Sequence, residues 1–570
     1  MLRNDQVVLC ACRGRIADRL PFDEISRFLE RMAPDMQVIV GDDLCQHHGL
    51  RRLVDERGSQ PLVIGACSQL RPRLYFWEEA SGLPLNPYAT RIVDLLEETA
   101  APYDEGEAVE RVKLLLWSQM KRASEFKGIS QRNLTLRIST RHNKVTRREF
   151  LVAPLPRYEV MPYIQSSKCI GGDSCRLCQD SCPLQAILIT EDKVTIDTSI
   201  CTGCGACVAA CPHGAVSYPT FSLEELDKEM EGLLLAEGIS LEPRIIALAC
   251  QTCLPGYESG GENQPGYPPN MLPLKIPCLA MASAWLMLRA FDMGAQGLAL
   301  ISGKDKCHSG FGGTVWWDNI RFIRAMLGCW GIEAGRVRLF EATENNRLDV
   351  ERELSQFAQE IARMNPTLLR AIDHTLVSTE GLRLPALIRE MGKKLLRSPE
   401  GTISTGAVPF GEVTLDAAQC TGCGLCAQNC PTGALTILPG DDGIEYQLLF
   451  RHDSCVACGT CVNMCPEDCL ELEHILELDR MGGGTAVLFR DSIVKCRRCG
   501  RPVAPKSMIA GLKCKLQQAG NRLADQLELC PLCRAGAPRY ELVGIDRDTQ
   551  VTAVDTDSAI YDCAGRGRSE

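Results

Sequence analysis

The stretch CTGCGLCAQNCP, residues 420–431, is the clearest indication of the fold in this chain, because its four closely spaced cysteines can bind metal. Three further segments of the chain contain four closely spaced cysteines in a similar arrangement, and we call each of the four segments a run. The sixteen cysteines are Cys169, Cys175, Cys178 and Cys182; Cys201, Cys204, Cys207 and Cys211; Cys420, Cys423, Cys426 and Cys430; and Cys455, Cys458, Cys461 and Cys465. A proline follows the last cysteine of every run and turns the chain. This spacing is typical of thiolates that bind [4Fe-4S] cubes, and it predicts single-electron chemistry.

Three of the four runs have the C-x2-C-x2-C-x3-C-P spacing of bacterial two-cluster ferredoxins, and the resemblance implies that the fourth cysteine of each run reaches the neighbouring cube. The implied ligand sets are Cys169, Cys175, Cys178 and Cys211; Cys201, Cys204, Cys207 and Cys182; Cys420, Cys423, Cys426 and Cys465; and Cys455, Cys458, Cys461 and Cys430. The first run departs from the pattern, because five residues separate Cys169 from Cys175. Either an enlarged loop still lets Cys169 bind, or this site holds three irons.

The composition favours a protein of a reducing compartment. The chain has 570 residues, of which 45% are hydrophobic and 24% charged, with a net charge of −10. Its 32 cysteines and the lack of a signal-like amino terminus favour metal-bound thiolates over disulfides and predict a cytoplasmic location. The longest apolar stretch, residues 276–288, is shorter than the ~20 residues that span a bilayer. The acidic charge argues against nucleic acid as a partner.

Two segments outside the cysteine runs have the pattern of small parallel sheets. Short runs rich in Val, Ile and Leu predict buried strands at residues 6–12, 36–40, 61–67, 244–249, 272–277, 297–302 and 337–340. The predicted fold is therefore multidomain, α/β and α+β. Its parts are an α/β module at 1–155, a bacterial-ferredoxin-like module at 160–220, a second α/β module at 240–366, a helical connector at 367–404, a second ferredoxin-like module at 405–478, a zinc-ribbon-like module at 490–540 and a tail at 541–570.

Cysteines follow the predicted strands of both α/β modules. They are Cys10, Cys12, Cys45 and Cys67 in the first module and Cys250, Cys253, Cys278 and Cys307 in the second. The carboxyl ends of parallel strands meet at one edge of a sheet, where ligands bind, so each set predicts a site for one cluster. The alternative is that these cysteines pack as small hydrophobic side chains, although scattered core cysteines would not all fall at one edge.

Both α/β modules resemble known iron–sulfur proteins. Residues 1–125, with Leu9-Cys10-Ala11-Cys12, Gly65-Ala66-Cys67-Ser68 and Leu85-Asn86-Pro87-Tyr88, resemble the N-terminal domain of the HdrA protein of heterodisulfide reductase, which implies a [4Fe-4S] cluster. Residues 244–365, with Cys250-x2-Cys253, Tyr267-Pro268-Pro269-Asn270, Cys278 and Asp305-Lys306-Cys307-His308, resemble the delta iron–sulfur subunit of methyl-viologen-reducing hydrogenase, which implies a [2Fe-2S] cluster. That family has a further cysteine where this sequence has Ser302, so four candidate ligands remain.

Two features of the reductase family are missing from the sequence. No G-x-G-x-x-G lies between a predicted strand and helix, so we expect no FAD or NAD site in this chain. Without flavin the chain should not split electron pairs, since iron–sulfur clusters pass one electron at a time. The adjacent cysteine pairs of the disulfide-reducing subunit are also absent, which argues against direct heterodisulfide reduction.

Four cysteines near the carboxyl end form a separate pattern. The pairs Cys496/Cys499 and Cys530/Cys533 predict a tetrahedral four-sulfur site, with zinc favoured over a single iron. Residues 492–524 carry eight basic residues and no acidic residue, so a solvated face and a docking surface for an acidic partner both remain open. Four other cysteines have no assigned role, namely Cys329, Cys469, Cys514 and Cys563.

Together these patterns predict an iron–sulfur electron-transfer subunit of a heterodisulfide-reductase/hydrogenase-type complex. We expect four ferredoxin-type [4Fe-4S] clusters, one more in the N-terminal module, one [2Fe-2S] cluster and one zinc. The expected partners are redox subunits such as a flavoprotein, a hydrogenase or a formate dehydrogenase, with no catalytic residue in this chain. The alternatives are an autonomous iron–sulfur reductase and a redox-responsive regulatory or scaffold protein.

Overall fold

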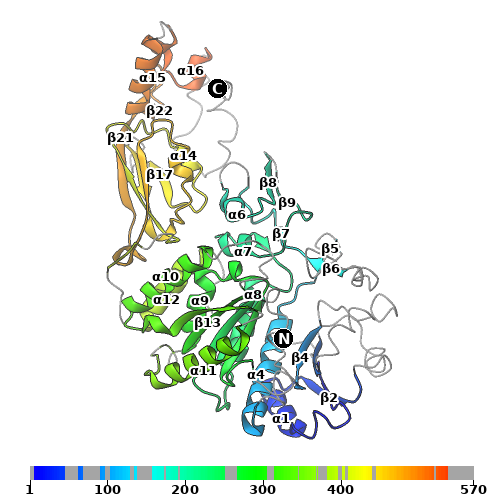
Figure 1. The fold of residues 1–570 in the computed structure, drawn as a ribbon. Coiled ribbons are helices and arrows are strands. Elements are labelled where there is room, and N and C mark those ends of the chain that lie inside the picture. Colours follow the sequence, from blue (N-terminus) through cyan, green and yellow to red (C-terminus); the bar gives the residue numbers. More distant parts are fainter. Residues whose placement is uncertain are drawn as a thin grey trace. The chain divides into compact units, whose positions relative to one another are not determined.

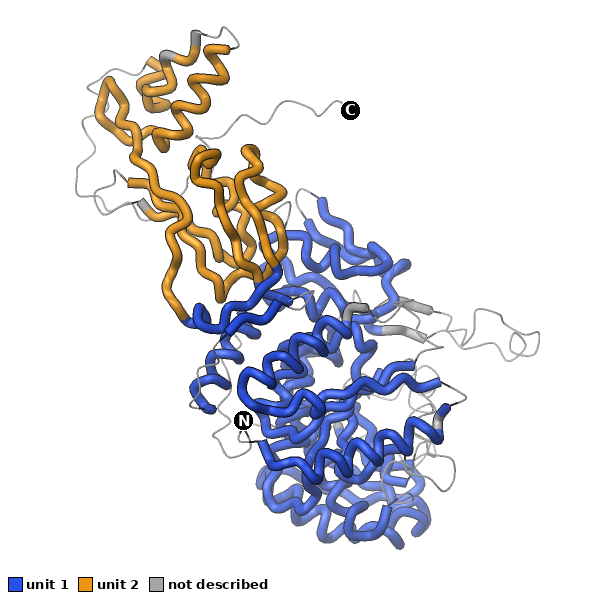
Figure 2. The backbone as a smooth tube through the Cα atoms, turned by 60° about the vertical axis from the view of Figure 1, so that its left-hand side comes forward, with its two compact units in different colours: residues 1–410, 474–482 blue, residues 411–473, 483–570 orange. Residues whose placement is uncertain are grey.

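The structure is a computed structural model of the 570-residue chain. It describes residues 6–44, 62–67, 90–96, 103–128, 134–137, 157–171, 175–190, 193–250, 266–303, 314–343, 346–367, 369, 382–395, 401–404, 408–439, 445–518 and 522–536. The chain forms two compact units, residues 1–410 with 474–482 and residues 411–473 with 483–570 (Figure 2). Each unit buries apolar clusters of its own.

The first sheet of unit 1 is parallel and has the strand order β2-β1-β3-β4. Its edge strands β2 and β4 are labelled in Figure 1. Its strands are β1 (Gln6–Cys10), β2 (Gln37–Gly41), β3 (Leu62–Ala66) and β4 (Arg91–Asp94). Helices α1 (Phe22–Met32) and α4 (Glu105–Ser124) pack against it. The three apolar runs predicted as strands are confirmed, whereas β4 was not predicted because it is short and half charged.

The second sheet of unit 1 is also parallel, with the equivalent order β12-β11-β13-β14. Its strands are β11 (Ile245–Cys250), β12 (Met271–Ile276), β13 (Gly297–Gly303) and β14 (Val337–Ala342), and its helices are α9 (Ala284–Asp292), α10 (Thr314–Cys329) and α11 (Arg347–Arg363). Alternate residues of the strands enter two different apolar clusters, one shared with α9 and α10 and one shared with α11. Both faces of this sheet are therefore covered, as expected of continuous apolar strands. Pro273 lies in the edge strand β12, where a missing N–H is tolerated.

Helix α8 (Leu223–Leu234) joins the two α/β modules by packing against α4. Ser222 and Glu225 form a capping box that begins the helix. The two helices approach most closely at Gly232, where a Cβ atom would lie 2.5 Å from the Cα of Ser118. Arg111 of α4, itself 1% exposed, donates to the carbonyl groups of Pro269 and Met271 at 2.7 and 2.8 Å. The modules thus share a buried interface.

Because α4 and α8 cross closely at Gly232, we expect one added methyl group there to lower the stability of unit 1. We expect Gly232→Ala to destabilise unit 1 by about 1–3 kcal/mol, because overpacking forces the helices apart. Gly328→Ala is the matched control, since Gly328 in α10 has open space around the position of a Cβ and should gain about 0.5–1 kcal/mol in helix propensity. All six tryptophans precede residue 331, so urea unfolding followed by tryptophan fluorescence reports on unit 1. Equal midpoints for the two variants would contradict the close crossing.

The first ferredoxin module also belongs to unit 1 and consists of short elements. They are β7 (Tyr163–Ile164), α6 (Leu177–Asp180), β8 (Ile187–Thr190), β9 (Lys193–Ile196), α7 (Ala206–Ala210) and β10 (Val216–Ser217). Strand β7 pairs with β10 and β8 pairs with β9, so the two cysteine runs lie in a pseudo-symmetric arrangement of two antiparallel pairs. A further antiparallel pair, β5 (Leu134–Arg137) with β6 (Arg157–Val160), precedes this module.

Unit 2 contains the second ferredoxin module and the four-cysteine segment. Strand β16 (Gly411–Leu415) pairs with β19 (Leu470–His474), and the short helices α13 (Leu425–Gln428) and α14 (Thr460–Asn463) lie within the cysteine runs. A second sheet has the order β17-β18-β21-β22. Its strands are β17 (Leu435–Pro439), β18 (Glu445–Phe450), β21 (Ala486–Lys495) and β22 (Pro502–Pro505), and α15 (Lys506–Gln518) and α16 (Pro531–Arg534) complete the unit.

The predicted connector at 367–404 is described only in part. It contains α12 (Arg383–Lys394) and β15 (Thr402–Ile403), and β15 pairs with β20 (Leu476–Glu477) within unit 1. Among the described residues, none of the helices combines the length and apolar character that crossing a bilayer requires.

Candidate iron–sulfur sites

The cysteine loops of the first ferredoxin module line a pocket with about 350 Å³ of empty space, part of which is open to solvent. Four of its lining residues are the predicted crossed set Cys182, Cys201, Cys204 and Cys207, together with apolar side chains such as Ile187 and Ile196. Gly205 begins α7 with a φ of +78°, a conformation that suits glycine and lets the chain bend between Cys204 and Cys207. The sulfur donors and the apolar wall fit a cubane cluster.

The other predicted set of this module also comes together. The thiol of Cys178 interacts electrostatically with those of Cys175, Cys211 and Cys169. Burial and these neighbours raise the pKa of Cys178 to about 12. The structure thus brings Cys169 to the site despite the longer spacing. Cys207 of the adjacent site also interacts with Cys178, so the two sites are neighbours.

The second ferredoxin module, in unit 2, repeats this arrangement. A pocket with about 320 Å³ of empty space, part of which is open to solvent, is lined by the predicted crossed set Cys430, Cys455, Cys458 and Cys461. The remaining set is Cys420, Cys423, Cys426 and Cys465, whose thiols interact with one another. Burial raises the pKa values of Cys426 and Cys455 to about 12 and that of Cys461 to about 11. Buried thiols near one another lose their protons when iron binds, so the sites suit a metal cluster.

Backbone N–H groups point at several of these sulfur atoms. Cys182, Cys201 and Cys211 accept from Ala186, Gly203 and Ala215 at 3.3, 3.4 and 3.2 Å. In unit 2, Cys420 and Cys430 accept from Gly422 and Leu435 at 3.4 and 3.5 Å. Such hydrogen bonds stabilise thiolate charge and help to set cluster potentials.

Cys469 contacts a ligand set that the sequence pattern did not assign to it. Its sulfur lies 3.5 Å from that of Cys465, and it also interacts with Cys420. The pKa of Cys469 is raised mainly by burial and further by these two neighbouring thiols. Cys469 lies four residues after Cys465, just beyond the Cys-Pro pair. This short separation was the one sign in the sequence that Cys469 could lie near the ligands.

Three of the four N-terminal cysteines meet at the carboxyl edge of the first sheet. Cys10, Cys12 and Cys67 are all buried, and the thiol of Cys10 interacts with the other two. Burial raises the pKa of Cys10 to about 11, while backbone N–H groups of Leu44 and Cys12 lower it in part. Cys45, the fourth predicted ligand, lies outside the described residues.

Cys250 and Cys278 lie at the equivalent edge of the second sheet, and both are buried. Cys250 ends β11 and its sulfur donates to the carbonyl of Pro277 at 3.4 Å. Cys253 and Cys307, the other predicted ligands, lie outside the described residues. The structure therefore describes two of the four predicted ligands of this site.

The second α/β module contacts the first ferredoxin module through Cys278. Its thiol interacts with that of Cys204, and both pack with Ala206 and Ala280 in one apolar cluster. Met281 lies against the backbone of Gly205, where a Cβ atom would meet the Met281 sulfur at 3.0 Å. The pKa of Cys204 is raised to about 12, mainly by burial and further by the neighbouring thiols. Two predicted sites of different modules are thus in contact.

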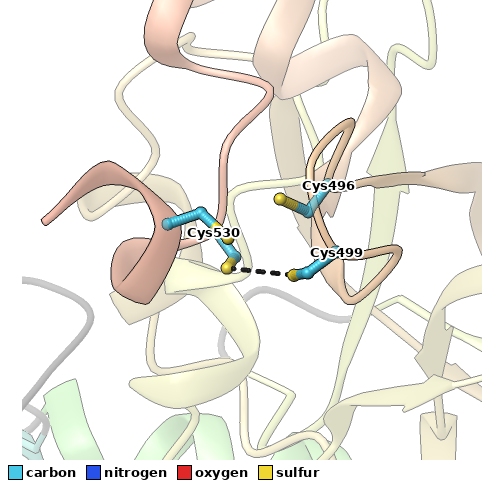
Figure 3. A group of neighbouring side chains, drawn as sticks. Cys496, Cys499 and Cys530 are labelled. Atoms are coloured by element: carbon cyan, nitrogen blue, oxygen red, sulfur yellow. Dashed lines mark hydrogen bonds between the residues drawn. The ribbon is translucent and has the colours of Figure 1, made fainter. Parts of the chain in front are cut away.

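Near the carboxyl end, four cysteines form the compact set that we call the four-cysteine group: Cys496, Cys499, Cys530 and Cys533. Their sulfur atoms all lie within 4.8 Å of one another, and those of Cys499 and Cys530 are 3.6 Å apart (Figure 3). Tetrahedral zinc with bonds of about 2.3 Å requires sulfur atoms about 3.8 Å apart, so the group fits such a metal. Burial acts to raise the pKa of Cys496, but N–H groups of Cys530, Cys499 and Arg498 lower it to about 6.

The remaining cysteines show no such grouping in the described part of the chain. Cys329 ends α10 half-buried, and burial raises its pKa. Cys514 is exposed on α15, where it accepts from Gln518 at 3.4 Å. Cys563 lies outside the described residues. The basic side chains near the four-cysteine group are partly neutralised, because Lys513 pairs with Glu528 and Lys515 with Glu467.

Three segments of the chain match known protein families. Residues 145–215 and 419–470 each match the 4Fe-4S dicluster domain, and residues 245–365 match the delta subunit of methyl-viologen-reducing hydrogenase. The prediction of hydrogenase-delta and ferredoxin relationships is thereby confirmed. These matches begin at residue 145, so the resemblance of residues 1–125 to the HdrA protein of heterodisulfide reductase stays a prediction.

Individual relatives cover different shares of the chain. A 7Fe ferredoxin of Hydrogenibacillus schlegelii is 38% identical over 65 residues, which are 11% of this chain and 82% of that protein. An iron–sulfur subunit of the vhc hydrogenase of Methanococcus voltae is 27% identical over 134 residues, which are 23% of this chain and 91% of that subunit.

A third relative comes from the ion-translocating oxidoreductase complex of Methanosarcina acetivorans. This subunit is 50% identical over 48 residues, which are 8% of this chain and only 17% of the relative. The chain therefore belongs to the ferredoxin-type iron–sulfur proteins, and it joins two 4Fe-4S dicluster domains to a segment of the methyl-viologen-reducing hydrogenase delta-subunit family.

Proposed function

We propose that this chain is the electron-transfer subunit of a multi-subunit oxidoreductase and relays single electrons between redox partners. Iron–sulfur clusters supply one-electron chemistry when bound. The protein's own residues hold them, exclude water and donate N–H groups to sulfur. The proposed partners are redox subunits such as a flavoprotein, a hydrogenase or a formate dehydrogenase, and the proposed location is the cytoplasm.

The contact between Cys204 and Cys278 carries this proposal. A protein that only stored clusters would have no need to place cysteines of two separate modules against one another. Here a ferredoxin site and a hydrogenase-delta-like site meet through two candidate ligands in a buried apolar cluster. Together with the neighbouring thiols of Cys178 and Cys207, the contact supports a continuous series of sites through unit 1.

The proposed inventory extends this series. It comprises four crossed ferredoxin-type [4Fe-4S] sites, a [4Fe-4S] site formed by Cys10, Cys12, Cys45 and Cys67, and a [2Fe-2S] site formed by Cys250, Cys253, Cys278 and Cys307. The four-cysteine group would hold zinc rather than a single iron in a zinc-ribbon-like module. Its sulfur atoms fit a tetrahedron, and among the described residues no aromatic side chain joins its apolar cluster.

Electron paramagnetic resonance of the full chain tests the proposed contact. In anaerobic protein reduced stepwise with dithionite, we expect magnetic interaction between the site at Cys204 and the site at Cys278. Cys278→Ser should abolish that interaction together with the [2Fe-2S] signal. Cys67→Ser is the matched control, since it alters a strand-end cysteine of the other α/β module and should leave the interaction intact. Two fully reduced centres without interaction in the native protein would contradict a relay between these modules.

A further inference from the structure

The four-cysteine group is built onto the second ferredoxin module rather than attached through a loose linker. Strand β21 leads directly into Cys496, and over residues 486–492 it pairs with β18 of the ferredoxin hairpin. Strand β22 then pairs with β21, and Val503 of β22 packs against the four cysteines. One sheet therefore carries both the ferredoxin hairpin and the four-cysteine group.

Helix α15 connects the four-cysteine group to the loop that contains Cys420. Glu528 makes the first link, because its carbonyl accepts from the Arg497 N–H at 3.2 Å and its carboxylate pairs with Lys513 of α15. At the start of the helix, the Ser507 N–H donates to the Asp491 carboxylate of β21 at 2.7 Å. The position of α15 therefore depends on the segments that carry both cysteine pairs.

Strands β21 and β22 and helix α15 pack against the loop that contains Cys420. A Cβ atom at Gly422 would meet the Pro505 Cβ at 3.1 Å and the Phe489 ring at 3.2 Å, and a Cβ at Gly511 of α15 would meet Thr421 at 3.5 Å. Lys515 of α15 also pairs with Glu467, two residues after Cys465, at 3.0 Å. These contacts reach residues beside the Cys420 and Cys465 ligands of the same predicted set.

We propose that the metal-filled four-cysteine group is a brace that holds the Cys420 loop closed over its cluster. The brace acts on one of the two sites of this ferredoxin module, because its contacts fall on the Cys420 loop and the segment after Cys465. Without metal the four cysteines have only weak mutual attraction, so β22 and α15 lose their anchor. This inference rests on the proposed metal site in the four-cysteine group.

Cysteine footprinting of the anaerobic, cluster-loaded full chain tests the brace. Iodoacetamide labels a ligand cysteine only when its loop opens or its cluster is lost, and peptide mass spectrometry reads each cysteine separately. In Cys533→Ser we expect zinc loss and labelling of Cys420 and Cys423 that is about tenfold faster, since labelling follows the open population. Labelling of Cys455 and Cys461 in the same module should stay unchanged.

Two further variants separate the brace from general damage. Pro505→Gly keeps all four cysteines of the group but removes the ring from Gly422, so it should speed labelling of Cys420 while zinc is retained. Cys514→Ser, on the exposed side of α15, should change neither zinc content nor labelling. If Cys533→Ser fails to fold, chelation of zinc from the native chain with TPEN replaces it, with the same cysteines compared.

The possible outcomes test the brace and the metal site separately. Zinc loss with selective labelling at Cys420 and Cys423 supports both. Zinc loss with unchanged labelling, or with equal acceleration at Cys455 and Cys461, overturns the brace and leaves the metal site standing. A native chain whose four-cysteine group holds no metal overturns both proposals.

Discussion

Replacing Cys207 by alanine is expected to remove about four iron atoms per chain, out of about sixteen in the four ferredoxin-type cubes. Cys207 is buried and lines the pocket of the first ferredoxin module with the three other thiols of its set. Loss of one thiolate leaves the site one short of the four cysteines that usually hold a cube, so we expect the whole cube to be lost rather than kept with three irons. Colorimetric iron analysis and the spin count of the dithionite-reduced protein measure the loss.

Two comparisons make this result specific. Cys461→Ala removes the equivalent lining residue of the pocket in unit 2, so it should cost the same amount of iron. The double variant should lose about eight iron atoms. Cys329→Ser removes a half-buried thiol that lines neither pocket and should retain all iron. Full iron content in Cys207→Ala would contradict the assigned ligand set.

Glu229→Gln is expected to destabilise unit 1 by about 3–5 kcal/mol, because it leaves the buried guanidinium of Arg122 without its carboxylate. Arg122 and Glu229 are ion-paired between α4 and α8, with side chains only 5% and 2% exposed. Glu229 also accepts from the Gln119 amide at 2.6 Å, and Arg122 donates to the Thr220 carbonyl. The urea midpoint from tryptophan fluorescence measures the change.

The neighbouring pair on the same two helices is the control. Lys121 and Glu231 are 27% and 21% exposed and 2.9 Å apart, so Glu231→Gln should cost about 1 kcal/mol or less. Equal effects of the two substitutions would show that burial does not determine the strength of the α4–α8 interface. A selective effect would show that the buried Arg122 pair contributes more to the α4–α8 interface than the partly exposed Lys121 pair.

Local sequence signals were sufficient for seven of the eight strands in the two parallel sheets and for most cysteine sets. Apolar runs predicted seven strands, and the structure places a strand at each of them. The crossed ligand sets follow from spacing and the ferredoxin resemblance, and the structure brings those thiols together, including Cys169. Short-range spacing carries this information because one loop supplies three of the four cysteines of each site.

Contacts between modules could not be predicted in the same way. Cys204 and Cys278 are separated by α8 and by two strands of the second sheet, and no local pattern indicates that they meet. Strand β21 likewise gives no sign in the sequence that it extends the ferredoxin hairpin. Such pairings depend on how whole modules pack, which a single sequence does not encode locally.

The most direct test of the relay is anaerobic affinity capture of the tagged full chain from its native cells, with the bound proteins identified and quantified by mass spectrometry. If the chain is a relay, we expect recovery of a flavoprotein, a hydrogenase or another redox subunit in stoichiometric amount. Reduction of the captured complex through that partner should then reduce the clusters of this chain. Recovery of the chain alone, with its clusters intact and with turnover of an added electron acceptor, would contradict the relay and identify an autonomous reductase.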